Sequence, residues 1–430
     1  MMRGSLRGLL FFMLFLLWAL FAGCGGGGGG SGATQTGGTS DQNVLPIAVD
    51  GGPTAAGSNL VYPNAAFASV TVCIPGTSKC QTIVGVLVDT GSTGLRLLSK
   101  SSGGALTLSL PTQTAGDDPM NECIQFVDGR YAWGSVHIAD VKLSGELASS
   151  VPIHVIEHGL YAVPSDCSSS GGPELDLQSL GANGILGVGQ YQHDCGAACA
   201  PAPGGLPLTE HYYSCSATSG CRPVFATFAQ QVQNPVALFP EDNNGVIIQF
   251  PPISSAQASV KGSMIFGIGT QANNGLGSAA VLTPNHNSAI TTIYHNQSLP
   301  QSYIDTGSNG YFFPDPAIPQ CTSSNVEGFY CPSTPLNLSA TNRGANGEEN
   351  AVSFGVDNAS MLFSSPSTMD YFAFGNLAGP NTFPNETTDN TQSSTLSSFI
   401  WGLPFFYGRT VYTAIEGKNT PAGPGPYWAY

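Results

Sequence analysis

The residues best suited to chemistry are two aspartates that begin the same short sequence. Asp89 opens Asp-Thr-Gly-Ser-Thr-Gly, and Asp305 opens Asp-Thr-Gly-Ser-Asn-Gly. A single Asp-Thr-Gly is a weak signal, because average residue usage produces it at on the order of one position in ten thousand. Two copies of the longer sequence in one chain are much harder to reach by accident. Carboxyl groups within a few Å of each other do not ionise together easily, so such a pair can share one proton and serve as both base and acid.

The surroundings of each aspartate repeat as well. Apolar runs of strand type flank both aspartates, at 82–88 and 95–98 for the first and at 302–304 and 311–313 for the second. A later apolar segment then ends in a glycine in each half. Gly187 lies 98 residues after Asp89, and Gly402 lies 97 residues after Asp305. Two units with the same order and nearly the same spacing indicate a duplicated lobe.

This double pattern resembles the pepsin-like aspartic proteases, in which each lobe contributes an Asp-Thr-Gly loop and a later apolar-apolar-Gly segment. The resemblance covers roughly residues 60–417. It implies an all-β fold of two duplicated lobes with a cleft between them. It also implies that Asp89 and Asp305 are catalytic and hydrolyse peptide bonds with a water held between them. The sequence contains no long pattern of 3.6-residue period, which independently favours a mainly β chain.

The resemblance implies roles for the residues that follow each aspartate. The glycines let the backbone approach the carboxylates, the threonines brace the two loops against each other, and the serines hydrogen-bond the outer carboxylate oxygens. These six supporting residues are Thr90, Gly91, Ser92, Thr306, Gly307 and Ser308. No metal and no organic cofactor is expected for this chemistry.

A hairpin is predicted after the first aspartate, at 123–136, where the family has the flap that closes over the substrate. Its two strands are joined through Asp128-Gly129, a dipeptide preferred in two-residue turns that need positive φ at both positions. The candidate flap residues are Phe126, Asp128, Gly129 and Tyr131.

Two positions of the flap region depart from the family. The family's flap usually carries a Tyr that hydrogen-bonds a Trp seven residues after the first aspartate. Phe126 and Arg96 stand at these positions here. Either the flap is held differently, with Tyr131 and Trp133 as candidates, or catalysis is relaxed.

The first 23 residues are predicted to be a signal peptide outside the fold. Two arginines precede an apolar run at 9–21 that is too short for a comfortable membrane span and is typical of a signal peptide. Phe-Ala-Gly-Cys, ending at Cys24, resembles a bacterial lipobox in which the cysteine carries lipid; an ordinary secretory signal is the alternative. Residues 24–43 include this cysteine and a Gly/Ser-rich tether. The chain is similar to an uncharacterised bacterial branch of exported lipoproteins, and Gly25 favours the outer membrane of the cell envelope.

The rest of the chain is predicted to divide into an N-terminal lobe at 44–240 and a C-terminal lobe at 241–430, with a short helix at 225–232. Without the signal peptide, ten basic residues face 27 acidic ones, a net charge of −17. This excess argues against a nucleic-acid partner, because no basic patch is available to bind phosphates. We expect a monomer whose partners are a peptide or protein substrate and, through the lipid at Cys24, the membrane.

Ten of the eleven cysteines remain if Cys24 carries lipid, which predicts up to five disulfides in an oxidising compartment. Close spacing favours Cys73–Cys80 and Cys321–Cys331. The pairing of six others is left open, namely Cys123, Cys167, Cys195, Cys199, Cys215 and Cys221. The alternative for part of this set is a metal site, whose spacing matches no common zinc pattern; its ligands would be His193, Cys195, Cys199 and His211.

Two other classes of function fit part of the pattern. A pepsin-like protein whose cleft binds a peptide or glycan without cutting it is favoured by the altered flap and opposed by the presence of both aspartates. A phosphotransferase of the actin and sugar-kinase type also places Asp-containing loops at strand ends in two lobes. The missing helical pattern, the export signal and the cysteines speak against ATP chemistry.

Overall fold

A computed structural model describes residues 42–53, 62–157, 159, 161–169, 171–202, 205–207, 211–364, 370–381 and 398–430. Residues 1–39 and 40–430 are two separate units, and every described residue belongs to the second. The predicted signal peptide and Cys24 therefore lie outside the described residues. Within the described part, no helix is long and apolar enough to span a membrane.

The described chain is mainly β, as the sequence predicts, and most strands belong to two sheets. Eleven strands of the first half lie in a 16-stranded sheet: β1 (Val44–Val49), β2 (Ala66–Cys73), β3 (Cys80–Asp89), β4 (Thr93–Leu98), β5 (Thr114–Ala115), β6 (Asp118–Gln125), β7 (Tyr131–Leu143), β8 (Glu146–Ile156), β9 (Gly184–Val188), β10 (Tyr212–Ser216) and β11 (Gly220–Pro223). The second half adds β12 (Gly245–Gln249), β13 (Val260–Phe266), β14 (Val281–Leu282), β22 (Thr410–Ala414) and β25 (Tyr427–Ala429).

The second sheet has seven strands, all from the second half. They are β15 (Ile290–Tyr294), β16 (Gln297–Ile304), β17 (Tyr311–Phe312), β18 (Leu336–Arg343), β19 (Glu349–Val356), β20 (Ala378–Gly379) and β21 (Ile400–Trp401). A small hairpin joins β23 (Asn419–Thr420) and β24 (Gly423–Pro424). The helices are short: α1 (Ser165–Ser168), α2 (Leu177–Leu180) and α3 (Ala359–Ser364), with 3-10 turns η1 (Lys100–Ser102), η2 (Gly196–Ala198), η3 (Pro235–Leu238) and η5 (Leu403–Phe406).

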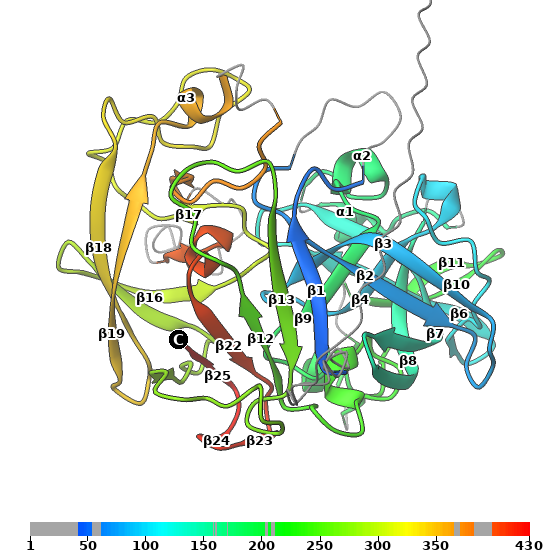
Figure 1. Ribbon diagram of the computed structural model, residues 1–430. Coiled ribbons are helices and arrows are strands. Elements are labelled where there is room, and N and C mark those ends of the chain that lie inside the picture. Colours follow the sequence, from blue (N-terminus) through cyan, green and yellow to red (C-terminus); the bar gives the residue numbers. More distant parts are fainter. Residues whose placement is uncertain are drawn as a thin grey trace, which may run out of the picture. The chain divides into compact units, whose positions relative to one another are not determined.

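The first strand links the two halves. All six residues of β1 pair with β13, whereas only two pair with β2. Beyond β13, the sheet continues through β12 to β22, and Figure 1 shows these strands side by side in the middle of the described region. Leu45, Ile47 and Val49 alternate along β1 and are buried, as expected for a strand with one face in the core.

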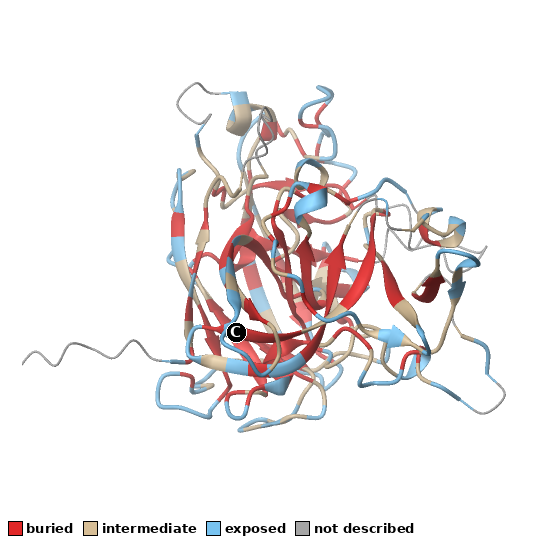
Figure 2. Ribbon diagram, turned by 90° about the vertical axis from the view of Figure 1, so that its right-hand side faces the viewer, coloured by how far each residue is buried: buried red, intermediate tan, exposed pale blue. Residues whose placement is uncertain are grey.

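Several strands next to the two aspartate loops are completely buried, or are buried at the end that meets the loop. Every residue of β4, β9, β17 and β21 is buried, and so are the last four residues of β3. Figure 2 shows this buried interior, with the exposed residues gathered in loops and at strand ends. In the second half, aromatic rings pack beneath the aspartate, with the Phe399 and Trp401 rings stacked at 4.0 Å between centroids. Both aspartates therefore stand on rigid elements.

The structure contains five disulfides: Cys73–Cys80, Cys123–Cys167, Cys195–Cys199, Cys215–Cys221 and Cys321–Cys331. Both pairs predicted from close spacing are confirmed, and the other six cysteines are assigned. Disulfides at this density are typical of a protein that works outside the cytoplasm. Because Cys195 and Cys199 are bonded to each other, their sulfurs are not available as the thiolate ligands of the alternative metal site.

The predicted short helix at 225–232 is wrong. Residues 224–232 form an irregular segment with a turn at 228–230. Within this segment, the Gln230 and Gln231 N–H groups both donate to the Thr227 carbonyl, which makes a single turn. Side chains add further bonds: the Gln230 amide oxygen accepts from the backbone and hydroxyl of Thr227, and the Gln231 amide donates to the Gly196 and Ala226 carbonyls.

Candidate active site

The two aspartates end equivalent strands in the two halves. In the first half, β3 runs parallel to β9, with Asp89 opposite Gly187, and β4 returns antiparallel to β9. In the second half, β16 runs parallel to β21, with Ile304 opposite Trp401, and β17 returns antiparallel to β21. The sequence duplication is thus a structural duplication of one strand-loop-strand unit.

Close backbone approach explains the glycine that follows 97 or 98 residues after each aspartate. A Cβ atom at Gly187 would lie 2.8 Å from the Gly94 backbone, and one at Gly402 would lie 2.6 Å from the Ser308 carbonyl oxygen and even closer to that of Gly310. Real Cβ atoms do not come this close to backbone atoms. Only glycine at these positions lets the later strand pack directly against the aspartate loop.

The two threonines join the aspartate loops symmetrically. The Thr90 backbone N–H donates to Thr306 Oγ1 at 3.0 Å, and the Thr306 N–H donates to Thr90 Oγ1 at 3.0 Å. Thr306 Oγ1 also donates to the Val88 carbonyl at 2.8 Å. Both threonines are buried, so these reciprocal bonds are shielded from water and hold the loops in one relative position.

Each carboxylate accepts the same two hydrogen bonds. The Gly91 N–H donates to Asp89 Oδ1 at 2.8 Å, and the Ser92 hydroxyl donates to Asp89 Oδ2. In the second loop, the Gly307 N–H and the Ser308 hydroxyl donate to Asp305 Oδ1 and Oδ2, both at 2.7 Å. The structure therefore brings together all eight residues of the two Asp-Thr-Gly-Ser segments.

The two carboxylates face one small space. A Cβ atom at Gly307 would lie 2.5 Å from Asp89 Oδ1 and 3.1 Å from Asp305 Oδ1, and one at Gly91 would lie 2.7 Å from Asp305 Oδ1. Burial and, next, the charge of Asp89 raise the pKa of Asp305 to about 8. The pair therefore retains a proton more readily than two isolated carboxyl groups would.

A cavity of about 500 Å³ contains both carboxylates and reaches the tip of the hairpin between β6 and β7. Apolar and aromatic side chains form much of its wall, among them Leu87, Ile124, Phe126, Leu180, Ile185 and Phe312. Charged groups also line it near the hairpin tip. Arg130 makes ion pairs with Asp128 at 2.6 Å and with Glu174 at 2.5 Å. Burial raises the pKa of Glu174 to about 7, although Arg130 acts in the opposite direction.

The predicted flap is present, but its turn differs from the predicted one. The strands β6 and β7 are longer than expected, and the Phe126 N–H donates to the Arg130 carbonyl across a three-residue loop. Only Gly129 in this loop has positive φ, at +87°. Asp128 does not adopt it, because its carboxylate accepts bonds from the backbone N–H and the Nε of Arg130. The two-residue turn is therefore wrong, and a three-residue loop with a left-handed glycine replaces it.

The candidate flap residues divide between the cavity and the core. Phe126 and Asp128 line the cavity. Tyr131 is buried, and its backbone bonds to Gly172 and Glu174 on a neighbouring segment. Trp133 packs edge-on against Tyr213 at 5.4 Å between centroids. Neither ring is among the described residues that line the cavity.

Sequence reasoning missed a buried cluster of charges beside the cavity. Arg96 on β4 lies 2.7 Å from Glu122 on β6 and 3.3 Å from Asp194, and all three side chains are at most 2% exposed. The only signal for it was an arginine inside the apolar strand at 93–98, since a buried charge requires a partner.

Two histidines complete this cluster. His154 lies 3.4 Å from Glu122, and burial lowers its pKa to about 4, which keeps it neutral. His211 lies 3.7 Å from Asp194. Burial, the largest single effect, lowers its pKa, but the hydrogen bond and charge of Asp194 together with the charge of Glu122 raise it above its ordinary value. By distance, ligand atoms of Glu122, Asp194 and His211 could hold a metal ion. Arg96 supplies one positive charge against the two carboxylates.

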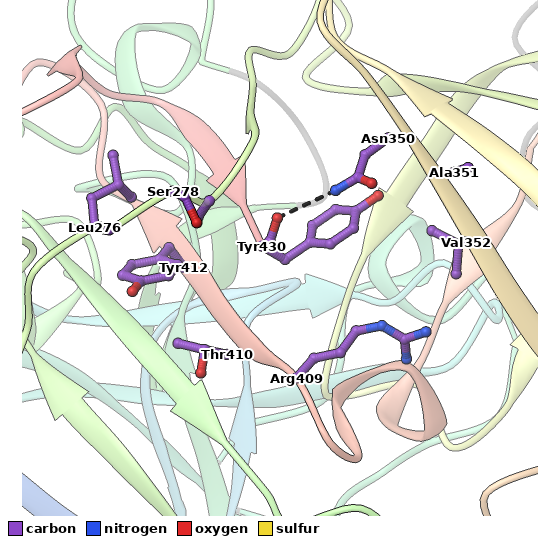
Figure 3. Close-up of a pocket in the computed structure, with 11 residues that line it drawn as sticks. Leu276, Ser278, Asn350, Ala351, Val352, Arg409, Thr410, Tyr412 and Tyr430 are labelled. Carbon is purple, nitrogen blue, oxygen red and sulfur yellow. Dashed lines mark hydrogen bonds between the residues drawn. The ribbon is translucent and has the colours of Figure 1, made fainter.

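A second cavity of about 500 Å³ lies in the other half and is shown in Figure 3. Arg409 is the charged residue of its lining, and its guanidinium donates to the Phe405 and Ser353 carbonyls. The Asn350 amide donates to the Tyr430 carbonyl oxygen at 3.3 Å. Arg409 and Asn350 thus bond to the backbone, whereas the two paired carboxylates lie in the first cavity.

The fold and the site define a mainly β protein with two aspartates paired in a cavity. The chain belongs to the family described as "Protein of unknown function (DUF3443)", whose model matches residues 39–430. No curated protein matches the chain. Among solved structures, the chain is similar to the crystal structure of aspartic proteinase from Irpex lacteus, with 16% identity and a TM-score of 0.46 over 90% of this chain and 96% of that chain.

Proposed function

We propose that this protein is an aspartic endopeptidase that hydrolyses peptide bonds with a water activated between Asp89 and Asp305. The observation that supports it best is the near-symmetric pair of carboxylates, each bonded to a glycine N–H and a serine hydroxyl at the base of one cavity. Apolar walls and a hairpin over the cavity suit an extended peptide.

The proposed reaction uses one proton and one water. With the shared proton on Asp305, Asp89 accepts a proton from the water as its oxygen attacks the scissile carbonyl carbon. Asp305 donates its proton to the carbonyl oxygen, which gives a tetrahedral diol. The proton on Asp89 then passes to the leaving nitrogen as the carbon–nitrogen bond breaks, and Asp305 recovers a proton from the diol. The balance requires no external oxidant, nucleophile or metal.

The proposal extends to where the enzyme acts. Lipid on Cys24 would hold it, as a monomer, at the bacterial cell envelope, with the outer membrane as its proposed site. The Gly/Ser-rich segment after Cys24 would be the tether of this anchor.

The test is cleavage of a mixed peptide library by the purified protein between about pH 3 and pH 8, with and without pepstatin. Asp89→Asn and Asp305→Asn should each lower kcat/KM by about a thousandfold or more, because each carboxyl is used in the reaction. Asp117→Asn, at an exposed aspartate outside the cavity, is the matched control and should leave cleavage unchanged. Circular dichroism should show that all variants are folded.

The competing function is a cleft that binds a peptide or glycan without cutting it. The altered flap positions, Phe126 and Arg96, are the observation that favours it. A folded protein that cuts no peptide at any pH, but retains peptides or glycans in a binding assay, would support this alternative. Cleavage that survives both aspartate substitutions would show that the active site lies elsewhere.

A further inference from the structure

We propose that the buried ion pair between Arg96 and Glu122 positions the flap over the two aspartates. This inference rests on the proposed function, because it assigns these residues to the placement of substrate in the same cavity. Arg96 Nη2 and Glu122 Oε1 are 2.7 Å apart, and both side chains are completely buried. Neither residue is a catalytic residue; each acts through the flap.

The position of the pair in the sheet makes it a determinant of flap placement. In the strand order, β7 and β8 separate β6 from β4, so a flat sheet would place β6 and β4 about 14 Å apart. Side chains stand roughly perpendicular to a sheet, so residues on these strands meet only where the sheet curls. The Arg96–Glu122 contact connects β4 and β6 where the sheet curls. It fixes the strand that leads to the flap tip relative to the strand that leaves the Asp89 loop.

The guanidinium of Arg96 joins three segments around the cavity. Its Nη1 donates to the Thr93 carbonyl at 2.5 Å, four residues after Asp89. Its Nη2 bonds to Glu122 in the flap strand and to Asp194, which accepts a bond from the Tyr212 hydroxyl on β10. Displacement of the flap strand would leave a buried cation with an incomplete set of partners, which is strongly unfavourable. The pair therefore favours one flap position.

The other contacts that hold the flap connect it to a different part of the chain. The Cys123–Cys167 disulfide and the Arg130–Glu174 ion pair connect the hairpin to the segment at 161–176. Arg96, on the strand that leaves the Asp89 loop, bonds through its side chain to Glu122 in the hairpin and to the Thr93 carbonyl of its own strand. Its loss should free the flap from the aspartates while these other contacts remain.

The test measures flap mobility and catalysis in the full chain. Arg96→Met should speed amide hydrogen exchange at 124–131 by tenfold or more, without a change in β18. On a peptide that the unchanged protein cuts, KM should rise by about tenfold. A substitution that only destabilises the fold would lower the amount of folded enzyme and the apparent kcat, and would leave KM unchanged. Arg343→Met, which removes an exposed ion pair with Glu349 in the other half, is the matched control and should change neither readout.

A double-variant comparison tests whether the two residues act through one contact. Glu122→Gln keeps the size of the side chain and removes its charge, so it should shift both readouts in the same direction as Arg96→Met. The double variant should be no worse than the worse single variant, because the same contact is lost. If Arg96→Met does not fold, flap exchange and KM are compared between Glu122→Gln and the unchanged protein.

Three outcomes would overturn the proposal: unchanged flap exchange in a folded variant, equal acceleration in the flap and in β18, or fully additive effects. Hydrogen exchange requires no cleavage. A protein that cuts no peptide would therefore refute the proposed function. The exchange measurement would still decide whether the Arg96–Glu122 pair positions the flap.

Discussion

Single residues set the pH range of the proposed reaction. Burial and the neighbouring Asp89 raise the pKa of Asp305 to about 8, so Asp305 is protonated below that pH and ionised above it. The mechanism requires one proton on the pair, because a doubly ionised pair has no acid to protonate the carbonyl oxygen. We therefore expect kcat/KM to fall as the pH rises through about 8. A pH profile on a peptide without ionisable side chains measures this limb, and a fall centred near pH 5 would contradict the assignment.

The identity of the paired residues follows from local sequence, whereas their electrostatic setting does not. The duplication around Asp89 and Asp305 predicts the strand-loop-strand units, because each unit is encoded by a short contiguous segment. The partners of Arg96 lie 26 and 98 residues away along the chain, so no local pattern connects them. Only the curl of the sheet brings them together. The sequence shows an arginine inside an apolar strand, but it does not show that the arginine contacts the flap.

At the scale of elements, the disulfides differ in how much chain they close. Cys123–Cys167 spans 44 residues and ties β6 to α1, whereas Cys321–Cys331 spans ten residues in the other half. In the loop-entropy description, the longer closure contributes about 4 kcal/mol and the shorter about 3 kcal/mol to the free energy of unfolding. Replacing both cysteines of the first pair by serine should therefore cost more stability than the same change in the second. Urea unfolding of both variants measures the difference, and an equal or reversed order would contradict it.

Separation along the chain also affects which contacts the sequence can predict. Cys73–Cys80 and Cys321–Cys331 are close pairs with no other cysteine nearby in the sequence, so their spacing predicted them. Cys195–Cys199 and Cys215–Cys221 are separated by only 4 and 6 residues, but they lie among six candidates whose pairing the spacing left open. The pairing of β1 with β13 joins segments about 200 residues apart and has no signature in either strand alone. The flap is an intermediate case. Asp128-Gly129 predicts where the turn lies but not which type of turn it is, because Arg130 donates hydrogen bonds to the Asp128 carboxylate.

At the scale of the whole molecule, charge should govern which peptides reach the cavity. The chain carries 27 acidic and 12 basic residues, and the cavity wall continues this excess. Apart from the buried pair Arg96 and Asp194, its charged residues are four acids, Asp89, Asp128, Glu174 and Asp305, and one base, Arg130. A cleft lined mainly by one sign of charge concentrates substrates of the opposite sign. Basic peptides should therefore be cut faster than acidic peptides of the same length and cleavage site.

The pH and salt dependence identify this effect. Glu174 ionises as the pH rises through about 7, so the preference for basic peptides should grow over that range and shrink as Glu174 becomes protonated at lower pH. Raising the salt from about 20 mM to about 500 mM should lower kcat/KM for the basic peptide by about tenfold, because screening shortens the range of the field. Glu174→Gln should reduce the preference, whereas Glu348→Gln, at an exposed residue of the β18–β19 hairpin outside the cavity, should not. Equal cleavage of acidic and basic peptides at low salt would show instead that the apolar wall alone selects the substrate.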